Sequence, residues 1–263
     1  MSVDRILLTN DDGVDAAGLR ALHDALAEKY AVTVVAPADD QSSVGRLLSE
    51  DVAVDEHGLG YVVDGTPVDC VVAGLGELVP DADAVVAGCN EGANLGAYTL
   101  GRSGTVSAAV EATFFSVPAV ATSVYVPGGD DWWKRDFETD DFAHAARATE
   151  FLLDEAADAG VFDRADYLNV NAPIADEERA PLRVTTPSTW YGMRAERNGD
   201  GRVGFSDPIW DRMNDGDVPD PVGTDRRAVV DGEVSVSPLS VPHAAEPNAG
   251  LDELVEAYEA VRS

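Results

Sequence analysis

Short runs of consecutive apolar residues alternate with helical patterns along this chain up to about residue 175. The apolar runs predict buried strands at residues 5–10, 31–36, 84–87, 118–124 and 167–170. The segments between them predict helices at residues 16–29, 103–115 and 140–159. Strands that are apolar throughout and are joined by helices are typical of a parallel sheet covered on both faces. The pattern therefore predicts the α/β class with a mostly parallel sheet.

Two local signals add detail to this plan. Residues 47–63 alternate roughly between apolar and polar, which predicts a hairpin that turns near His57 and Gly58. Further on, Thr66 precedes Pro67, a pair that suits the cap and the first position of a helix. We therefore expect a hairpin followed by a helix between the second and third core strands.

The character of the chain changes from about residue 175 onward. Gly, Pro, Asp and Arg become frequent there, and helical periodicity weakens. We expect loops and short strands over residues 183–240, partly outside the core sheet, and a terminal helix over 251–263. The prediction is a single domain, with a core of about 1–175 and a C-terminal extension of about 176–263.

Charge is the strongest compositional feature of the chain. It has 49 acidic residues against 18 basic ones, a net charge of −31, and the acidic residues are spread along its whole length. Because 45% of the residues are hydrophobic, a folded protein with a carboxylate-coated surface explains this balance better than a disordered acidic chain. Such surfaces are typical of cytoplasmic proteins of extreme halophiles. The lack of a basic stripe argues against nucleic-acid polymers as partners.

The absence of a membrane span and of a secretion signal predicts where the protein is located. No run of about 18 apolar residues occurs, so we expect no membrane span and no membrane partner. The first residues lead directly into a strand pattern, so we expect no secretion signal. Cys70 and Cys89 each sit in an apolar segment, which favours two buried reduced thiols over a disulfide. Together these points predict a cytoplasmic protein.

Polar residues gather directly after the predicted strands, where open parallel sheets bind their ligands. Residues 10–13 (NDDG), 41–43 (QSS) and 88–94 (GCNEGAN) follow the first three buried strands. Their carboxylates, hydroxyls and amide oxygens are hard ligands, which suit Mg²⁺, Mn²⁺ or Ca²⁺ and not zinc. Alternatively, Asp11 and Asp12 cap a helix, and Asn90 and Asn94 serve a turn beside Gly92.

The segment from Arg102 to Thr105 opens a predicted helix. Backbone N–H groups at a helix start, together with the hydroxyls of Ser103 and Thr105, form a site for an anion. A plain N-cap by Ser103 is the alternative. Other phosphate and nucleophile motifs are missing: no Gly-Lys-Ser/Thr, no G-x-S-x-G and no G-x-G-x-x-G after the first strand.

These segments resemble the SurE (survival protein E) family of 5′/3′-nucleotidases. The matching blocks are ILLTNDDGVDAAGLRAL (6–22), VVAPADDQSS (34–43), GTPVDCV (65–71), VVAGCNEGANLG (85–96), SGTVSAAVEA (103–112), NVNAP (169–173) and VGTDRRAVVDGEVSVSPL (222–239). They occur in the family's order and cover nearly the whole chain. Two departures stand out: the loop after the second strand lacks the family's usual Arg, and Arg102 replaces a frequent Tyr.

The resemblance implies a Rossmann-like three-layer core with a C-terminal extension that makes homodimer or homotetramer contacts. It implies a phosphomonoesterase for nucleoside 5′-monophosphates, with 3′-monophosphates and short polyphosphate as further substrates, and one divalent metal ion. The expected metal ligands are Asp11, Asp12, Ser42 and Asn90, with Asp11 and Asp12 also catalytic. The expected substrate-binding residues are Asn10, Asn94, Ser103, Gly104 and Thr105.

Two other functions stay open at this point. A haloacid-dehalogenase-type phosphatase would use an Asp nucleophile after the first strand, but it needs D-x-D and a later Lys, and Lys134 has no clear link to a strand end. A non-catalytic nucleotide-binding protein would keep the metal and anion sites without turnover. The base-binding residues are not assigned, because Tyr98, Trp190 and Tyr191 suit packing as well as stacking.

Overall fold

The computed structural model describes residues 3–128, 135–156, 158–176, 178–241, 249–250 and 254–255. Its core elements are β1 (Arg5–Thr9), α1 (Ala17–Leu26), β2 (Ala31–Pro37), β3 (Val54–His57), β4 (Gly60–Val63), α2 (Pro67–Ala73), η1 (Gly74–Leu78), β5 (Ala84–Asn90), α3 (Ala97–Leu100), α4 (Gly104–Phe114), β6 (Ala119–Tyr125), η3 (Thr139–Phe142), α5 (Ala143–Glu155), η4 (Val161–Asp163) and β7 (Tyr167–Pro173). The C-terminal elements are β8 (Leu182–Val184), β9 (Arg194–Arg197), β10 (Val203–Ser206), α6 (Ile209–Asn214), α7 (Asp225–Val230) and β11 (Val234–Leu239).

The described strands form a nine-stranded sheet in the order β3-β4-β2-β1-β5-β6-β7-β11-β8 and a separate β9–β10 hairpin. Within the large sheet, β3/β4 and β7/β11 are antiparallel and every other neighbouring pair is parallel. This mixed, mostly parallel sheet with helices confirms the predicted α/β fold. The expected strands, the hairpin and the helix after Thr66 are all present.

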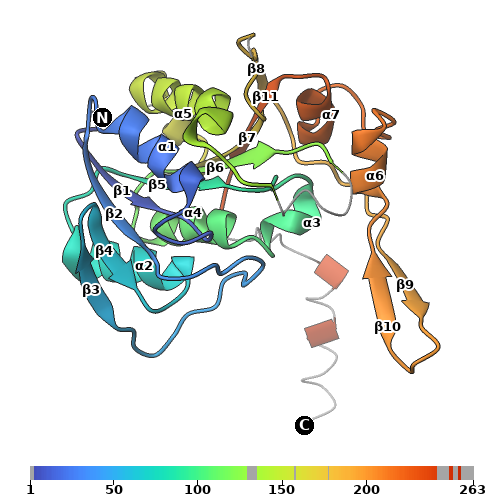
Figure 1. The fold of residues 1–263 in the computed structure, drawn as a ribbon, viewed down its shortest axis with the longest axis horizontal. Coiled ribbons are helices and arrows are strands. Elements are labelled where there is room, and N and C mark those ends of the chain that lie inside the picture. Colours follow the sequence, from blue (N-terminus) through green and yellow to red (C-terminus); the bar gives the residue numbers. More distant parts are fainter. Residues whose placement is uncertain are drawn as a thin grey trace.

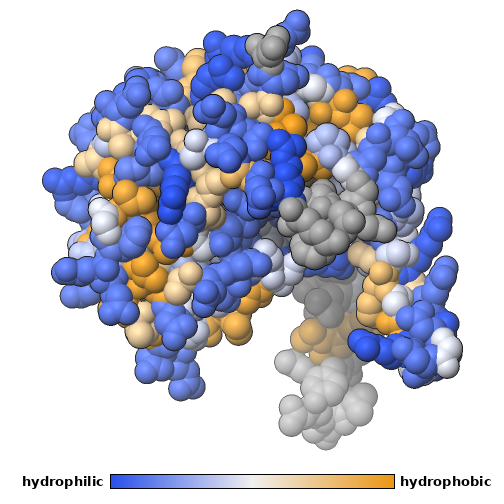
Figure 2. Space-filling model, in the orientation of Figure 1, coloured by the Kyte–Doolittle hydropathy of each residue, from blue (hydrophilic) through white to orange (hydrophobic). Residues whose placement is uncertain are grey.

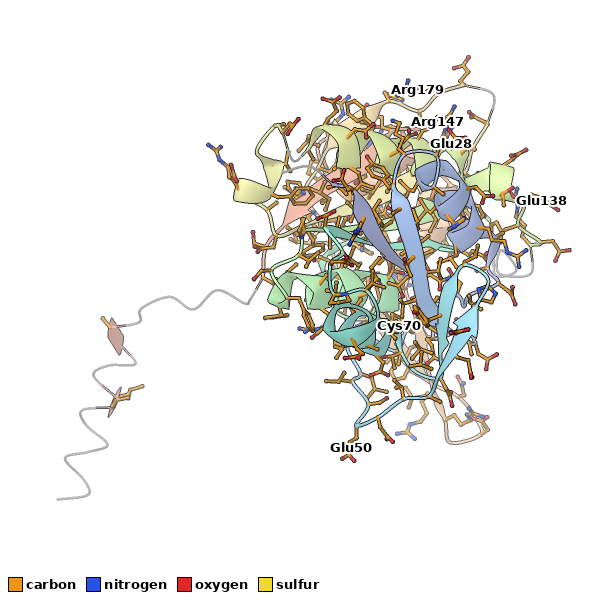
Figure 3. The ribbon with its side chains drawn as sticks, turned by 90° about the vertical axis from the view of Figure 1, so that its left-hand side faces the viewer. Glu28, Glu50, Cys70, Glu138, Arg147 and Arg179 are labelled. Atoms are coloured by element: carbon orange, nitrogen blue, oxygen red, sulfur yellow. The ribbon has the colours of Figure 1, made fainter. Side chains whose placement is uncertain are left out.

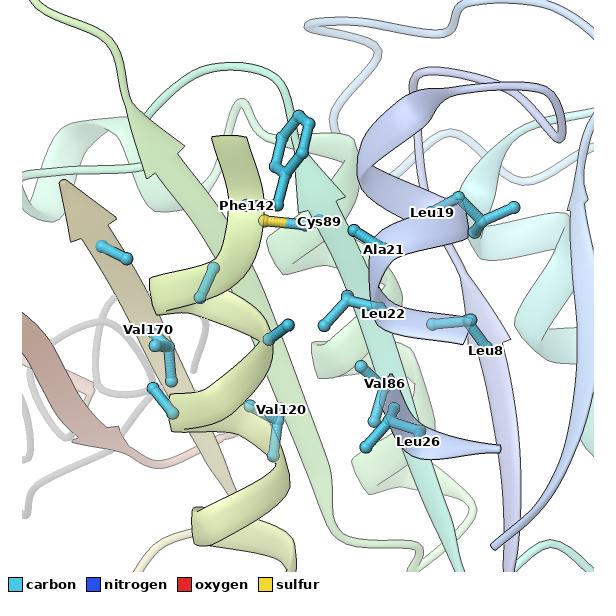
Figure 4. Packing of buried hydrophobic residues seen from close by; sticks show 14 of the residues in the cluster. Leu8, Leu19, Ala21, Leu22, Leu26, Val86, Cys89, Val120, Phe142 and Val170 are labelled. Atoms are coloured by element: carbon cyan, nitrogen blue, oxygen red, sulfur yellow. The ribbon is translucent and has the colours of Figure 1, made fainter. Parts of the chain in front are cut away.

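Helices cover the sheet on both faces, because the strands alternate their side chains between two apolar clusters (Figure 1). On one face, Leu8 and Val86 pack with α1 and α5, and Figure 4 shows Leu22 and Leu26 of α1 against this surface. On the other face, Leu7 of β1 packs with residues of α2 and α4. Each buried strand therefore contributes to two cores at once, which is why its sequence is apolar throughout.

The C-terminal part contains the expected loops and short strands, together with elements that were not predicted. β11 and β8 extend the main sheet beyond β7, and α6 and α7 are short helices that the sequence did not indicate. Leu95, Ile209 and Val229 belong to a third apolar cluster, which joins these helices to the end of the core. The β9–β10 hairpin projects away from the sheet (Figure 1). The terminal helix predicted for 251–263 lies outside the described residues apart from Leu254 and Val255.

Acidic side chains dominate the exterior. The net charge is −31, so 31 acidic side chains would lack a cationic partner even if every Arg and Lys paired with one carboxylate. Figure 2 shows a face that is mostly hydrophilic, and the labelled Glu50 and Glu138 lie at the periphery in Figure 3. Cys70 and Cys89 are buried and free, as predicted. None of the helices in the described ranges is long and apolar enough to span a membrane.

Candidate active site at the carboxyl edge of the sheet

A pocket of about 610 Å³ lies at the carboxyl ends of the central strands. Five of the predicted site residues line it: Asp11, Ser42, Asn90, Asn94 and Ser103. The other four, Asn10, Asp12, Gly104 and Thr105, are not among the lining residues. A smaller pocket of about 360 Å³, lined by Val3, Pro118 and Asp166 among others, lies near the opposite ends of these strands. The larger pocket therefore lies at the loops that follow the first three buried strands, with Asp11, Ser42, Asn90 and Asn94 in its lining.

Asp11 lies at the centre of the predicted chemistry, directly after β1. Its side chain is 3% exposed, and the Thr105 hydroxyl donates a hydrogen bond of 2.5 Å to Asp11 Oδ1. Burial raises the pKa of Asp11, although the Thr105 hydroxyl and N–H act to lower it. The first turn of α4 thus fixes the orientation of the carboxylate.

Gly104 allows this close approach of α4 to Asp11. A Cβ atom built on Gly104 would lie 2.8 Å from Asp11 Oδ2 and 2.9 Å from Asp11 Cβ. Any larger residue would therefore displace the carboxylate or the helix. Ser103 caps the same helix, since its hydroxyl accepts the N–H of Val106 at 3.0 Å. Ser103 is thus the helix N-cap that the sequence offered as the alternative to an anion site. It also lines the pocket.

Asp12 packs behind Asp11, and its Oδ2 accepts the N–H of Glu91 at 3.0 Å. Burial and the neighbouring Asp11 charge raise the pKa of Asp12 well above its usual value. Among the ion pairs of the described residues, none joins Asp11 or Asp12 to Arg or Lys. Two adjacent carboxylates without a cationic side chain are the arrangement that a bound metal ion stabilises.

The remaining oxygen donors fit that interpretation. Asn90 Nδ2 donates to the carbonyl of Gly92, so its Oδ1 is left as the free acceptor at the pocket. Ser42 is exposed, and its hydroxyl donates to Asp40 Oδ1 at 2.6 Å, which leaves the oxygen lone pairs available. No group of three or more His, Cys, Asp or Glu side chains in the described part of the chain has the arrangement of a metal site. The candidate set is therefore two carboxylates with two neutral oxygens, which suits a hard cation.

Glu91 is the third carboxylate near this centre, but it faces another element. Burial raises the pKa of Glu91, while the backbone N–H groups of Gly18 and Ala17 act to lower it. These N–H groups belong to the first turn of α1, so the carboxylate lies at the positive end of that helix. Glu91 therefore has a structural partner independent of any metal.

Asn94 and Asn10 are held by the protein itself. Asn94 Nδ2 donates to Ser123 Oγ at 2.9 Å, and its backbone N–H donates to Asn171 Oδ1 at 2.8 Å. Asn10 is fully buried, and its Nδ2 donates to the Gly13 carbonyl at 2.8 Å. Asn10 Oδ1 has no hydrogen-bond partner among the described residues. Asn94 lines the pocket and Asn10 supports the turn beneath it.

The far end of the pocket is largely apolar, and sequence reasoning considered only Tyr98 among its residues. Its lining residues there are Tyr98, Tyr125, Val126, Met193, Asp207, Trp210 and Asn214. Tyr125 follows the strand-end rule, since it closes β6, but Met193, Asp207, Trp210 and Asn214 come from the C-terminal part, where no motif marks them. The Tyr98 hydroxyl donates to Asp207, and the Tyr191 ring packs edge-on against Tyr98 with centroids 5.2 Å apart.

Comparison with known proteins agrees with this geometry. A family model described as Survival protein SurE matches residues 6–194. A protein named 5′-nucleotidase SurE from Natronomonas pharaonis is 62% identical over 257 residues, covering 97% of this chain and 99% of that protein. Another of the same name from Haloquadratum walsbyi is 60% identical over 255 residues, covering 96% of each.

A solved structure matches over the same length. The SurE protein from Aquifex aeolicus has a TM-score of 0.74 and 29% identity to this chain, and the match covers 97% of this chain and 99% of that one. The likeness therefore includes the C-terminal part, which the family model only begins to cover. On its sequence and on its fold, the chain belongs to the SurE family.

Proposed function

We propose that this chain is a metal-dependent 5′-nucleotidase that hydrolyses nucleoside 5′-monophosphates to nucleoside and phosphate. The observation that carries the proposal is the pocket itself: one end is lined by Asp11, with Asp12 next to it in the chain, and the other end has aromatic walls. A nucleotide has the same polarity, with a phosphate at one end and a flat base at the other. The names of the relatives support the same activity.

The site residues take distinct roles in this proposal. Asp11, Asp12, Ser42 and Asn90 hold one divalent ion, Mg²⁺ or Mn²⁺ or Ca²⁺, which supplies charge neutralisation and a lowered pKa for the attacking water. Asp11 orients that water, because Thr105 and Gly104 fix its carboxylate. The Ser103 hydroxyl and the Gly104 N–H at the start of α4, with Asn94 in the pocket wall beside them, contact the phosphoryl oxygens. Asn10 and Thr105 support the site from beneath.

The other end of the pocket provides a surface for the nucleoside. Tyr98, Tyr125, Met193 and Trp210 offer apolar and aromatic surface for the base and ribose. These side chains do not choose a base by themselves, so 3′-monophosphates and short polyphosphate remain further candidate substrates.

We also propose a cytoplasmic location and a homodimer or homotetramer. The projecting β9–β10 hairpin, with Phe205 77% exposed, offers a contact surface for the oligomer.

Removal of the metal tests the proposal directly. We expect phosphate release from nucleoside monophosphates to vanish after EDTA treatment and to return when Mg²⁺ or Mn²⁺ is added, because the buried carboxylates have no cation of their own. The measurement is inorganic phosphate in about 2 M KCl, where surface charges are screened. Folded protein that binds nucleotide with metal but releases no phosphate would instead identify a binding protein. A phosphoenzyme trapped on Asp11 would favour the haloacid-dehalogenase mechanism, whose required Lys134 lies outside the described residues.

The contact between Gly104 and Asp11 makes a second prediction. Gly104→Ala is expected to lower kcat by at least about tenfold, because the new methyl group would force the Asp11 carboxylate out of place. The matched control is Gly101→Ala, at a nearby glycine where a Cβ atom meets nothing within 4 Å. Steady-state kinetics and the melting temperature of both variants separate a local from a global effect. Equal kcat values for the two variants would contradict the role given to the α4–Asp11 contact.

A further inference from the structure

One wall of the pocket is a short segment that runs from Asn94 to Tyr98. Both end residues line the pocket, and Asn94 is also anchored on β7. The Asn94 carbonyl accepts hydrogen bonds from Asn169 Nδ2 at 3.0 Å and Asn171 Nδ2 at 3.2 Å. The core sheet therefore fixes the beginning of the segment. The side chains of Asn169 and Asn171 make no such hydrogen bond to Gly96 or Tyr98.

Asp225 holds the middle of this segment from the C-terminal part of the chain. Its side chain is fully buried at the start of α7, and its Oδ2 accepts the Gly96 N–H at 2.6 Å. Its Oδ1 accepts the N–H groups of Ser188 at 2.9 Å and Arg226 at 2.8 Å. Gly96 adopts φ +85°, a conformation that glycine favours, so the segment bends where Asp225 holds it. Loss of this acceptor would leave the Gly96 N–H buried without a partner.

Arg226 holds the end of the segment through Tyr98. The guanidinium carbon lies 5.3 Å from the centre of the Tyr98 ring, and Nη1 donates to the Trp190 carbonyl at 3.1 Å. A Cβ atom on Gly96 would lie 2.2 Å from Arg226 Nη2, so the guanidinium packs directly against the Gly96 backbone. The Arg226 side chain is fully buried, and its Nε and Nη2 have no hydrogen-bond partner among the described residues. The ring face of Tyr98 is therefore a principal partner of this cation.

We propose that Asp225 and Arg226 are positioning residues that hold the Asn94–Tyr98 wall in the geometry required for turnover, an inference that rests on the proposed nucleotidase function. Neither side chain lines the pocket, so both act through residues that do. Asp225 sets the backbone of the wall at Gly96, and Arg226 sets the plane of the Tyr98 ring. The site is thus complete only when α7 is in place.

Asp225→Asn tests this role with little change in size. The carboxamide keeps one oxygen for Ser188 and Arg226 but replaces the oxygen at Gly96 with an NH₂ group, which cannot accept that N–H. We expect kcat/KM for nucleoside monophosphates to fall about tenfold, the factor that corresponds to loss of one buried hydrogen bond. The metal concentration for half-maximal activity should not change, because Asp11, Asp12 and Ser42 lie on other segments. Amide hydrogen exchange at residues 95–98 should become faster.

Asp220→Asn is the matched control for this variant. Asp220 is also a buried acid and accepts the Ser188 hydroxyl, but it makes no hydrogen bond to the Asn94–Tyr98 wall. We expect it to lower the melting temperature without faster exchange at Gly96, whose N–H is held by Asp225. Should Asp225→Asn fail to fold in about 2 M KCl, Arg226→Lys replaces it, and faster exchange at Gly96 with a raised KM supports the proposal.

Two results would overturn the positioning role. One is wild-type kinetics and wild-type exchange at residues 95–98 in Asp225→Asn or its replacement. The other is an equal loss of kcat/KM in Asp225→Asn and Asp220→Asn, which would indicate general destabilisation. Absence of phosphate release from the wild type would instead contradict the proposed function. The exchange experiment does not require activity, so it still decides the positioning role in that case.

Discussion

Asp11→Asn is expected to lower phosphate release by about 10² to 10³-fold, the range seen when one preorganised charge-stabilising group is removed from an active site. The substitution removes one negative charge from the proposed metal site. It also replaces one of the two carboxylate oxygens that orient water with an NH₂ group. The fold should survive, because an uncharged amide at a buried position relieves its repulsion with Asp12. The melting temperature without metal is therefore expected to stay equal or to rise.

The control for Asp11→Asn is Asp15→Asn, which also removes one charge from the same end of the chain. Asp15 is 80% exposed and pairs with Arg20, so its loss should leave turnover unchanged. Phosphate release, metal titration and thermal unfolding of both variants are measured in about 2 M KCl, where surface charges are screened. Near-normal turnover in Asp11→Asn would remove this residue from the mechanism and leave Asp12 as the principal catalytic carboxylate.

Transfer from about 2 M to 0.1 M KCl is expected to unfold the protein or to lower its melting temperature strongly. The Debye length lengthens from below about 3 Å to about 10 Å over this range, so exposed carboxylates that are screened in molar salt repel one another in dilute buffer. With a net charge of −31, this repulsion acts across the whole surface and also opposes the approach of an anionic substrate. Activity should be lost together with the fold.

Circular dichroism, thermal unfolding and phosphate release across a KCl series measure this dependence. Sucrose at equal osmolarity is the control, because it stabilises folded proteins by exclusion from the surface but does not screen charge. Recovery by KCl and not by sucrose would identify screening as the cause. Full activity with an unchanged melting temperature at 0.1 M KCl would contradict the halophilic interpretation of the composition.

The core of the fold could be predicted because its strands are buried on both faces. Ile6, Leu7 and Leu8 are all fully buried although they point to opposite sides of the sheet, so the strand reads as an uninterrupted apolar run. The position after such a strand then indicated Asp11 without knowledge of any contact. The bond from Thr105 to Asp11 joins residues 94 positions apart, and only the folded chain shows it.

The C-terminal part was harder to predict from the sequence, because its helices and strands are short. α6 and α7 have six residues each, too few for an apolar repeat of 3.6 residues to become visible. β11 has the sequence VSVSPL, in which Val234 and Val236 belong to one core cluster and Leu239 packs against the other. As a result, the pocket residues Met193, Asp207 and Trp210 carried no recognisable signal, and their roles rest on where the fold places them.

The chain leaves the sheet after Val184 of β8 and returns at Val234 of β11, and these two strands are direct neighbours. Residues 185–233 are therefore an excursion whose two ends are already close in space. The entropy of closing such a loop changes slowly with its length, so residues can be gained, lost or exchanged there at little cost to the sheet. Met193, Asp207, Trp210 and Asn214 all lie within the excursion, whereas Asp11 and Asn90 lie outside it. Substrate preference can thus diverge between relatives by remodelling the part of this excursion that precedes α7, while α7 itself keeps its contacts with the Asn94–Tyr98 wall.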